Sequence, residues 1–175
     1  LDVARFAESA GFEQDFDRDD AWRYRDFVTR IFNEDIPYDE FVRLQIAGDL
    51  LQPDKADSII ATGFIVAGVE NLIQSRKEFV RDRYDKIDDM VSATATGLLG
   101  MTVACARCHD HKFDPILQRD YYRFAAAFAK TVSTNRDIKN DKSNIKVFCA
   151  SEVPDGRIRM VVVSEPHRKN LPSVL

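Results

Sequence analysis

Apolar residues recur at spacings of three and four through the first third of the chain, a pattern typical of short amphipathic helices. Glycine or proline follows each apolar segment, and both residues interrupt helices. Asp19 or Asp20 can serve as the N-cap of the second helix, and Pro37 lies in the first turn of the third. The pattern predicts four helices, over residues 1–10, from Asp19 or Asp20 to before Pro37, 37–51 and 56–63.

The longest regular pattern begins near Lys77 and leads directly into a Cys-x-x-Cys-His run. Its apolar positions alternate offsets of four and three, so we expect one continuous helical stripe that includes both cysteines. Pro115 should force a turn after the run, and a last helix is predicted over residues 119–130. The stripe consists of Ile87, Val91, Thr94, Leu98, Met101, Cys105 and Cys108.

The C-terminal part of the chain changes pattern. Residues 131–144 are polar and predict a loop, whereas residues 146–151 and 157–164 are β-like and are separated by the turn sequence 153–156. We therefore predict a mostly α fold with a small C-terminal β-hairpin. The expected organisation is a helical domain over 1–131, a loop over 132–144, and a hairpin region over 145–175 that belongs to the same body or begins a companion domain.

Composition limits the class of protein further. The 175 residues are 45% hydrophobic and include 12 Phe, enough for one packed domain. The net charge of −4 comes from well-mixed acidic and basic residues, so no nucleic-acid-binding surface is indicated. No run of about 18 apolar residues is present, so no transmembrane segment is expected. Leu1 begins in mid-pattern, and we expect the sequence to be a piece of a longer protein.

The Cys105-Ala106-Arg107-Cys108-His109 run carries the clearest chemistry. A Cys-x-x-Cys-His run is the signature of covalent c-type haem attachment, in which both thiols form thioethers and the histidine binds the iron. The predicted cofactor is therefore haem c, held by Cys105, Cys108 and His109. Because this attachment normally takes place outside the cytoplasm, we expect a periplasmic or otherwise exported protein.

Two other chemistries use the same residues. Cys105, Cys108, His109 and His111 are four ligands suited to zinc, but they crowd into seven residues, whereas structural zinc sites usually join two separated ligand pairs. A thioredoxin-like thiol pair would need a strand-to-helix junction, and the segment before Cys105 is predicted to be helical. The third cysteine, Cys149, is interpreted as buried.

Several separate blocks of the sequence are distinctive: LDVARFAES from Leu1, AWRYRD from Ala21, AGDLL from Ala47, ATGF from Ala61 and CARCHDHKFDPI from Cys105. Together they resemble the DUF1549 family, the planctomycete-type cytochrome c-like domain of large exported proteins. The resemblance covers roughly residues 1–131. It implies a mostly helical haem-bearing module, usually accompanied by a DUF1553 domain and often preceded by another cytochrome-like domain, with Cys105 and Cys108 as thioether anchors and His109 as the proximal ligand.

The ligand on the other face of the haem stays open. His111 is only two residues from His109 and would have to pass around the porphyrin edge, so a role in supporting the ligand or binding a propionate is favoured over iron ligation. Asp110 and Asp114 are interpreted either as orienting imidazoles or as capping the turn. Met101 is predicted to be core, while Met90, Met160 and His167 are distal candidates.

The sequence therefore predicts a c-type cytochrome module with one covalent haem that transfers electrons. Its expected partners are a redox protein, or a fused cytochrome or DUF1553-like domain. One alternative is a haem redox enzyme with an open or weakly ligated distal site, and another is a zinc-stabilised interaction domain. Arg23 and Arg25 are interpreted as solvated, or alternatively as partners of haem propionates.

Overall fold

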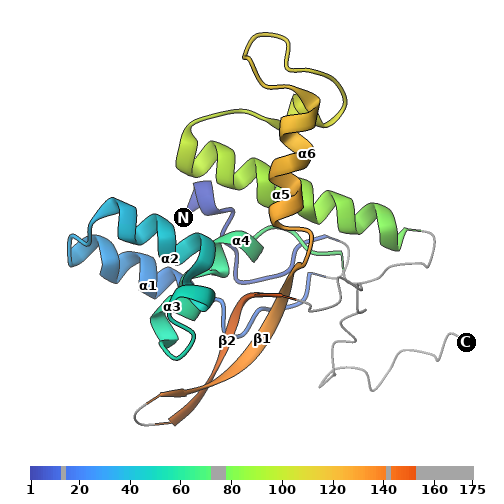
Figure 1. The fold of residues 1–175 in the computed structure, drawn as a ribbon. Coiled ribbons are helices and arrows are strands. Elements are labelled where there is room, and N and C mark those ends of the chain that lie inside the picture. The colour runs from blue at the N-terminus through green and yellow to red at the C-terminus, as the bar shows by residue number, and fades with distance from the viewer. Residues whose placement is uncertain (13–14, 72–77, 141–142, 153–175) are drawn as a thin grey trace, which may run out of the picture.

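A computed structural model describes residues 1–12, 15–71, 78–140 and 143–152 of the chain. About half of these residues are helical, and the last of them form a two-stranded antiparallel hairpin (Figure 1). The elements are η1 (Asp2–Ala4), α1 (Trp22–Asn33), α2 (Tyr38–Leu51), α3 (Ala56–Ala61), α4 (Gly63–Val66), α5 (Phe79–Leu99), η2 (Ala104–Arg107), α6 (Gln118–Ala127), β1 (Thr131–Asn140) and β2 (Ser143–Glu152).

Helices α1 to α3 confirm three of the predicted helices. Their inward faces are apolar, and the buried Tyr24 hydroxyl of α1 donates a hydrogen bond to Gln45 Oε1 of α2 at 2.6 Å. A Cβ built on Gly48 would lie 2.0 Å from the carbonyl oxygen of Ser58, so α2 and α3 approach each other as closely as only glycine allows. The fully buried side chains here include Phe27, Ile59 and Ile65.

The predicted helix over residues 1–10 is wrong beyond its first turn. Only the 3₁₀ turn η1 forms, and Arg5 ends it with a left-handed backbone (φ 56°). The Arg5 side chain then donates to Asp89 Oδ2 of α5 at 2.9 Å, and Ser9 pairs with Asp17 in an isolated β-bridge. Contacts with distant parts of the chain thus replace the local helical pattern.

Helix α5 begins as predicted but ends before the cysteines. Ile87, Val91 and Thr94 lie on its buried face, which confirms the first part of the expected stripe. The helix stops because Gly100 adopts a left-handed conformation (φ 65°), with the Gly100 N–H bonded to the carbonyl of Ala95. The predicted continuation of the stripe through Met101 to Cys108 is therefore wrong, and Cys105 lies on the separate turn η2.

The hairpin is displaced along the sequence from its predicted position. Residues 131–140 form strand β1 instead of a loop, and residues 146–151 lie in β2, which pairs with β1. The alternate β1 residues Val132, Thr134 and Ile138 share one face with Cys149 and Val147, and burial of this face offsets the weak strand propensity of Asn135 and Asp137. The other predicted strand, 157–164, lies outside the described residues, and the domain boundaries stay a prediction.

Residues 64–71 follow α3 in the chain and contact the N-terminal segment, α5 and β1. Gly63–Val66 forms the short helix α4. The carbonyls of the next two residues, Ala67 and Gly68, accept hydrogen bonds from the Arg18 side chain at 2.9 and 2.7 Å. Glu70 pairs with Lys86 of α5 at 2.6 Å and accepts from Ser133 of β1 at 2.9 Å. None of the helices in the described ranges is long and apolar enough to cross a membrane.

Candidate functional site

Cys105 lies on the 3₁₀ turn η2, and Cys108 is the residue that caps its C-terminal end. The backbone N–H groups of Cys108 and His109 both donate to the carbonyl of Cys105, at 3.2 and 3.4 Å. Between the cysteines, Ala106 is fully buried, whereas both thiols are free and exposed. The turn therefore anchors its small central residue inward and presents two thiols outward.

Arg107 connects this turn to α5. Its Nη2 donates to Asp85 Oδ1 at 2.7 Å, and its Nη1 donates to Asp88 Oδ2 at 3.1 Å. The hydrogen bond with Asp85 is the largest of the effects that raise the pKa of the guanidinium. The Tyr121 hydroxyl of α6 also donates to Asp88, and burial together with this bond raises the pKa of Tyr121.

The loop that follows is held by its own polar residues. The Asp110 carboxylate accepts the N–H of Gln118 at 2.8 Å and so satisfies a free donor at the start of α6. The N–H of His111 donates to the carbonyl of Ile116 at 2.8 Å, which closes the turn around Pro115. Of the two roles predicted for Asp110, the capping role is confirmed.

The two imidazoles of this loop face different partners. His109 is exposed, and its Nδ1 lies 2.8 Å from the carbonyl oxygen of Asp110. Because a carbonyl only accepts hydrogen bonds, Nδ1 is the donor, and the lone pair of a neutral ring is left on Nε2. Histidines that bind metals commonly hold the other ring nitrogen in this way.

His111 has the opposite arrangement. Its Nδ1 accepts the N–H of Asp114 at 2.9 Å, so the proton of the neutral ring lies on Nε2. The Asp114 carboxylate also lies 3.2 Å from Nδ1, a contact that becomes an ion pair only in a protonated ring. With its side chain only 8% exposed, His111 supports the loop, whereas His109 presents a nitrogen that can bind a metal.

The described residues contain no group of three or more His, Cys, Asp and Glu side chains gathered to hold a metal ion. The four residues of the zinc alternative, Cys105, Cys108, His109 and His111, are thus not brought together as a set. Haem attachment does not need such a cluster, because it uses two accessible thiols one turn apart and one imidazole nitrogen. Cys105, Cys108 and His109 supply these three donors.

The residues considered as ligands on the other face of the haem lie in different environments. Met90 is buried in the core on α5. Met101 is 42% exposed, so the prediction that it is core is wrong, because α5 ends before it. Met160 and His167 lie outside the described residues.

Arg23 and Arg25, the two arginines considered as partners of haem propionates, both bond to other parts of the chain. Arg23 donates to the carbonyl of Lys146 at 2.8 Å, and Arg25 pairs with Glu8. These contacts join α1 to β2 and to the N-terminal segment. Arg25 is 42% exposed, which agrees with the solvated interpretation, whereas the Arg23 side chain is 22% exposed and bonds to the hairpin.

The third cysteine, Cys149, is fully buried, as predicted, and burial raises the pKa of its thiol to about 12. It lies on β2, whose neighbouring Ala150 N–H donates to the Thr62 hydroxyl at 3.0 Å. Cys149 thus belongs to the packing of the hairpin on the helices.

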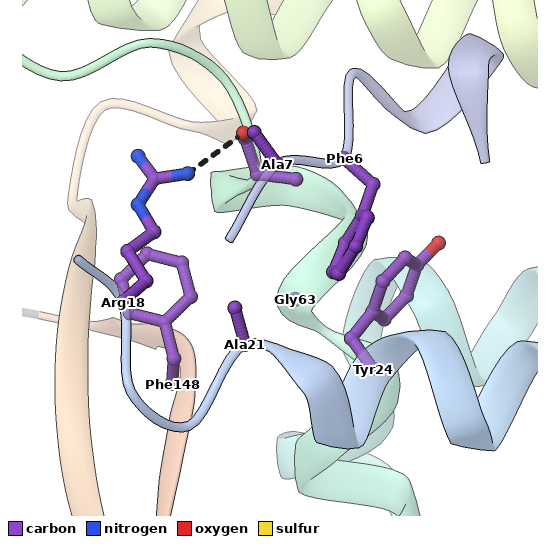
Figure 2. Close-up of a pocket in the computed structure, with 8 residues that line it drawn as sticks. Phe6, Ala7, Arg18, Ala21, Tyr24, Gly63 and Phe148 are labelled. Carbon is purple, nitrogen blue, oxygen red and sulfur yellow. Dashed lines mark hydrogen bonds between the residues drawn. The ribbon is translucent and has the colours of Figure 1, made fainter. Parts of the chain in front are cut away.

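A small pocket opens in the body between the N-terminal segment, α1 and β2. Figure 2 shows Arg18 extended over the ring of Phe148 on one side and the Phe6 and Tyr24 rings on the other. The pocket has room for about one water molecule. It is too small for an organic cofactor.

The polar network around Arg107 was not predicted. Asp85 and Asp88 are 22 and 19 residues from Arg107, and nothing in a single sequence pairs them. The only signal is their i, i+3 spacing on a predicted helix, which puts two carboxylates on one face.

These observations define a half-helical domain with a β-hairpin that displays an exposed Cys-x-x-Cys-His turn. Residues 1–133 match a family described as "Protein of unknown function (DUF1549)", and the chain belongs to this family. Neither the curated proteins nor the solved structures contain a match.

Proposed function

We propose that the chain is a c-type cytochrome module that transfers electrons in an exported protein. Cys105 and Cys108 would hold haem c through thioethers, and His109 would bind the iron through Nε2. When bound, the haem supplies an iron that alternates between the ferric and ferrous states. The observation that carries the proposal is the exposed pair of thiols on η2, followed by an imidazole whose Nδ1 is held by the Asp110 carbonyl.

The chain's own residues prepare this site. Ala106 anchors the turn, and Asp110 and His111 hold the loop, so that His109 can keep the orientation in which Nε2 is free. Because Cys105, Cys108 and His109 are exposed, a partner protein could approach a haem held by these residues. This favours electron exchange with a redox protein, or with a fused cytochrome or DUF1553-like domain.

The proposal is tested by expression with an export signal and the machinery for haem maturation. The wild-type chain should gain the mass of one haem and give a pyridine haemochrome spectrum typical of two thioethers. Cys105→Ala with Cys108→Ala should abolish the adduct, whereas the matched control Cys149→Ala should keep it. Absence of any covalent haem on the wild-type chain would falsify the proposal, and zinc found in its place by metal analysis would support the zinc alternative.

A second candidate is a haem redox enzyme with an open iron site. The positions of His111 and Met90 favour this candidate. His111 bonds within its own loop and Met90 is buried in the core, so neither of these two described residues is available as a second iron ligand. Carbon monoxide and cyanide should bind rapidly to such a site and shift its absorption bands. Spectra unchanged by both ligands would support the closed electron carrier.

A further inference from the structure

We propose that Arg107 is a positioning residue that holds the Cys105–Cys108 turn in its attachment geometry before any cofactor binds. The consequence for haem attachment rests on the proposed function, but the preformed turn does not. Thioether formation needs both thiols on the same side, and Arg107 stands between them in the sequence. Arg107 ties the turn to two helices, α5 and α6.

The side chain of Arg107 makes the first connection, to α5. Its two terminal nitrogens bond to two different carboxylates, Asp85 and Asp88, which lie one turn apart on the helix. The planar guanidinium has donors in a fixed fork that suits such a pair, whereas a lysine ammonium is a single point charge. Asp88 is half-buried and Asp85 is exposed, and a linked set of ion pairs holds a geometry better than an isolated pair does.

The backbone of Arg107 makes the second connection, to α6. Its carbonyl oxygen accepts from the Tyr122 hydroxyl at 3.1 Å and from Gln118 Nε2 at 3.2 Å. The buried Tyr121, also on α6, bonds to the same Asp88 that holds the guanidinium. Arg107 is therefore fixed through its side chain and through its main chain at once.

The flanking cysteines differ from Arg107 in this respect. Their backbones share one hydrogen bond within the turn, from the Cys108 N–H to the Cys105 carbonyl, and both side chains are exposed. The direction of both thiols thus depends on the two residues between them, the buried Ala106 and the hydrogen-bonded Arg107. A turn that is already ordered loses less conformational entropy when it binds, which is the general advantage of preorganisation.

The test uses the full chain without haem, compared by amide hydrogen exchange. Arg107→Gln should raise the exchange rates of the Cys108 and His109 amides by about tenfold, because both bonds belong to the turn. Arg107→Lys should give an intermediate rise, since one ammonium can satisfy only one carboxylate well. The matched control is Arg123→Gln, which removes an equal charge from an exposed arginine of α6 paired with Asp120 and should leave both amides unchanged.

A second variant keeps the test decisive if the Arg107 variants do not fold. Tyr121→Phe retains the buried ring and removes only the hydroxyl bond to Asp88, so a smaller rise in the same amides is expected. Exchange equal to wild type in the folded Arg107 variants, or in Tyr121→Phe if those variants do not fold, would overturn the positioning role.

The same chains are then expressed with haem maturation, and the fraction carrying covalent haem is measured by intact mass. This fraction should fall in Arg107→Gln and stay at the wild-type value in Arg123→Gln. Faster exchange in Arg107→Gln, together with a wild-type chain that takes up no haem, would support the preformed turn and refute the cytochrome proposal. The preformed turn and the cytochrome proposal can therefore be refuted independently of each other.

Discussion

The body and the motif arm of this molecule are held together by different forces. The body, defined here as α1 to α4 with β2, contains the fully buried Phe27, Ile59 and Val147. The motif arm, residues 100–118, contains few buried side chains and carries Phe113 at 83% exposure. In Figure 1 the arm runs from the end of α5 to the start of α6, on the far side of the molecule from the hairpin tip.

Polar bonds replace apolar packing in the arm. Arg107, Asp110 and His111 each bond to a backbone group or a carboxylate, and together they fix the loop without a core of its own. A segment built in this way can expose its thiols and imidazole while the body stays packed. The two regions should therefore respond to different substitutions.

The largest difference is expected from removing one phenyl ring in each region. Phe27→Ala should lower the free energy of unfolding by about 3–5 kcal/mol, because it empties a core position on α1. Phe113→Ala removes the same group from the exposed arm and should change stability by less than about 0.5 kcal/mol. Urea unfolding followed by circular dichroism measures both, and equal losses would contradict the contrast between the regions.

The cysteines should differ next, in their reaction with an alkylating reagent. Cys105 and Cys108 are exposed, whereas Cys149 is buried and has a raised thiol pKa, so it should react at least about 100-fold more slowly at pH 8. Mass mapping of labelled peptides gives the three rates. In strong denaturant the rates should converge, and a Cys149 that reacts as fast as Cys105 in the native protein would show that β2 is not packed as described.

A smaller effect is expected from the cap of α6. Asp110→Ala removes the acceptor of the Gln118 N–H and should cost about 1 kcal/mol of stability, as the loss of a helix cap does. The matched control in the same loop is Lys112→Ala, an exposed residue expected to change stability by less than about 0.5 kcal/mol. Thermal unfolding of the two variants compares them directly, and an Asp110 variant as stable as the control would remove the capping role.

The smallest effect concerns pH and Glu70, which connects α5 to β1 outside the motif arm. Burial alone would raise the pKa of Glu70, but Lys86, Ser133 and Arg18 outweigh it and hold this pKa below its usual value. The unfolded chain therefore binds the proton more readily than the native one. The stability contributed by Glu70 is complete above the unfolded pKa of about 4.3 and is lost as pH falls through the lower native value.

This sign can be checked with Glu70→Gln. Wild type and variant should differ most in unfolding free energy at pH 6, and the difference should shrink as the pH is lowered below about 4. Glu8→Gln, which breaks the exposed pair with Arg25, is the control and should alter stability by less than about 1 kcal/mol. A difference for Glu70→Gln that grows toward low pH would reverse the assignment.

The sequence predicted the elements whose signal is local. The apolar spacing of α1, α2 and α3 and the proline-stopped turn before α6 are confirmed. Strand β1 was missed because its exposed face carries Asn135 and Asp137, which are rare in strands, although the alternate residues Val132, Thr134 and Ile138 were a usable signal. The pairing of β1 with β2 and the burial of one face depend on tertiary contacts, which cannot be read from composition.

The candidate site was predicted in part. Cys105, Cys108 and His109 stand out in the sequence, and the structure brings them onto one exposed turn and its flank. The opposite hydrogen-bonding of His109 and His111 could not be predicted, because it depends on which ring nitrogen meets a carbonyl and which meets an N–H. The bridge from Arg107 to Asp85 and Asp88 likewise depends on how the chain turns back along α5.

The left-handed stop at Gly100 has a consequence for how this part of the sequence can vary. In an uninterrupted helix, each inserted residue would rotate everything beyond it by about 100°, and one insertion would turn the cysteines away from their side. After the stop, the rotational phase of α5 is no longer transmitted, because the turn at Ala104–Arg107 takes its orientation from its own contacts. A Cβ at Gly100 would meet nothing within 4 Å, so only the backbone conformation requires glycine there. The direction of the thiols therefore depends on how Arg107 meets Asp85 and Asp88, and the length of α5 beyond Asp88 can change independently of it.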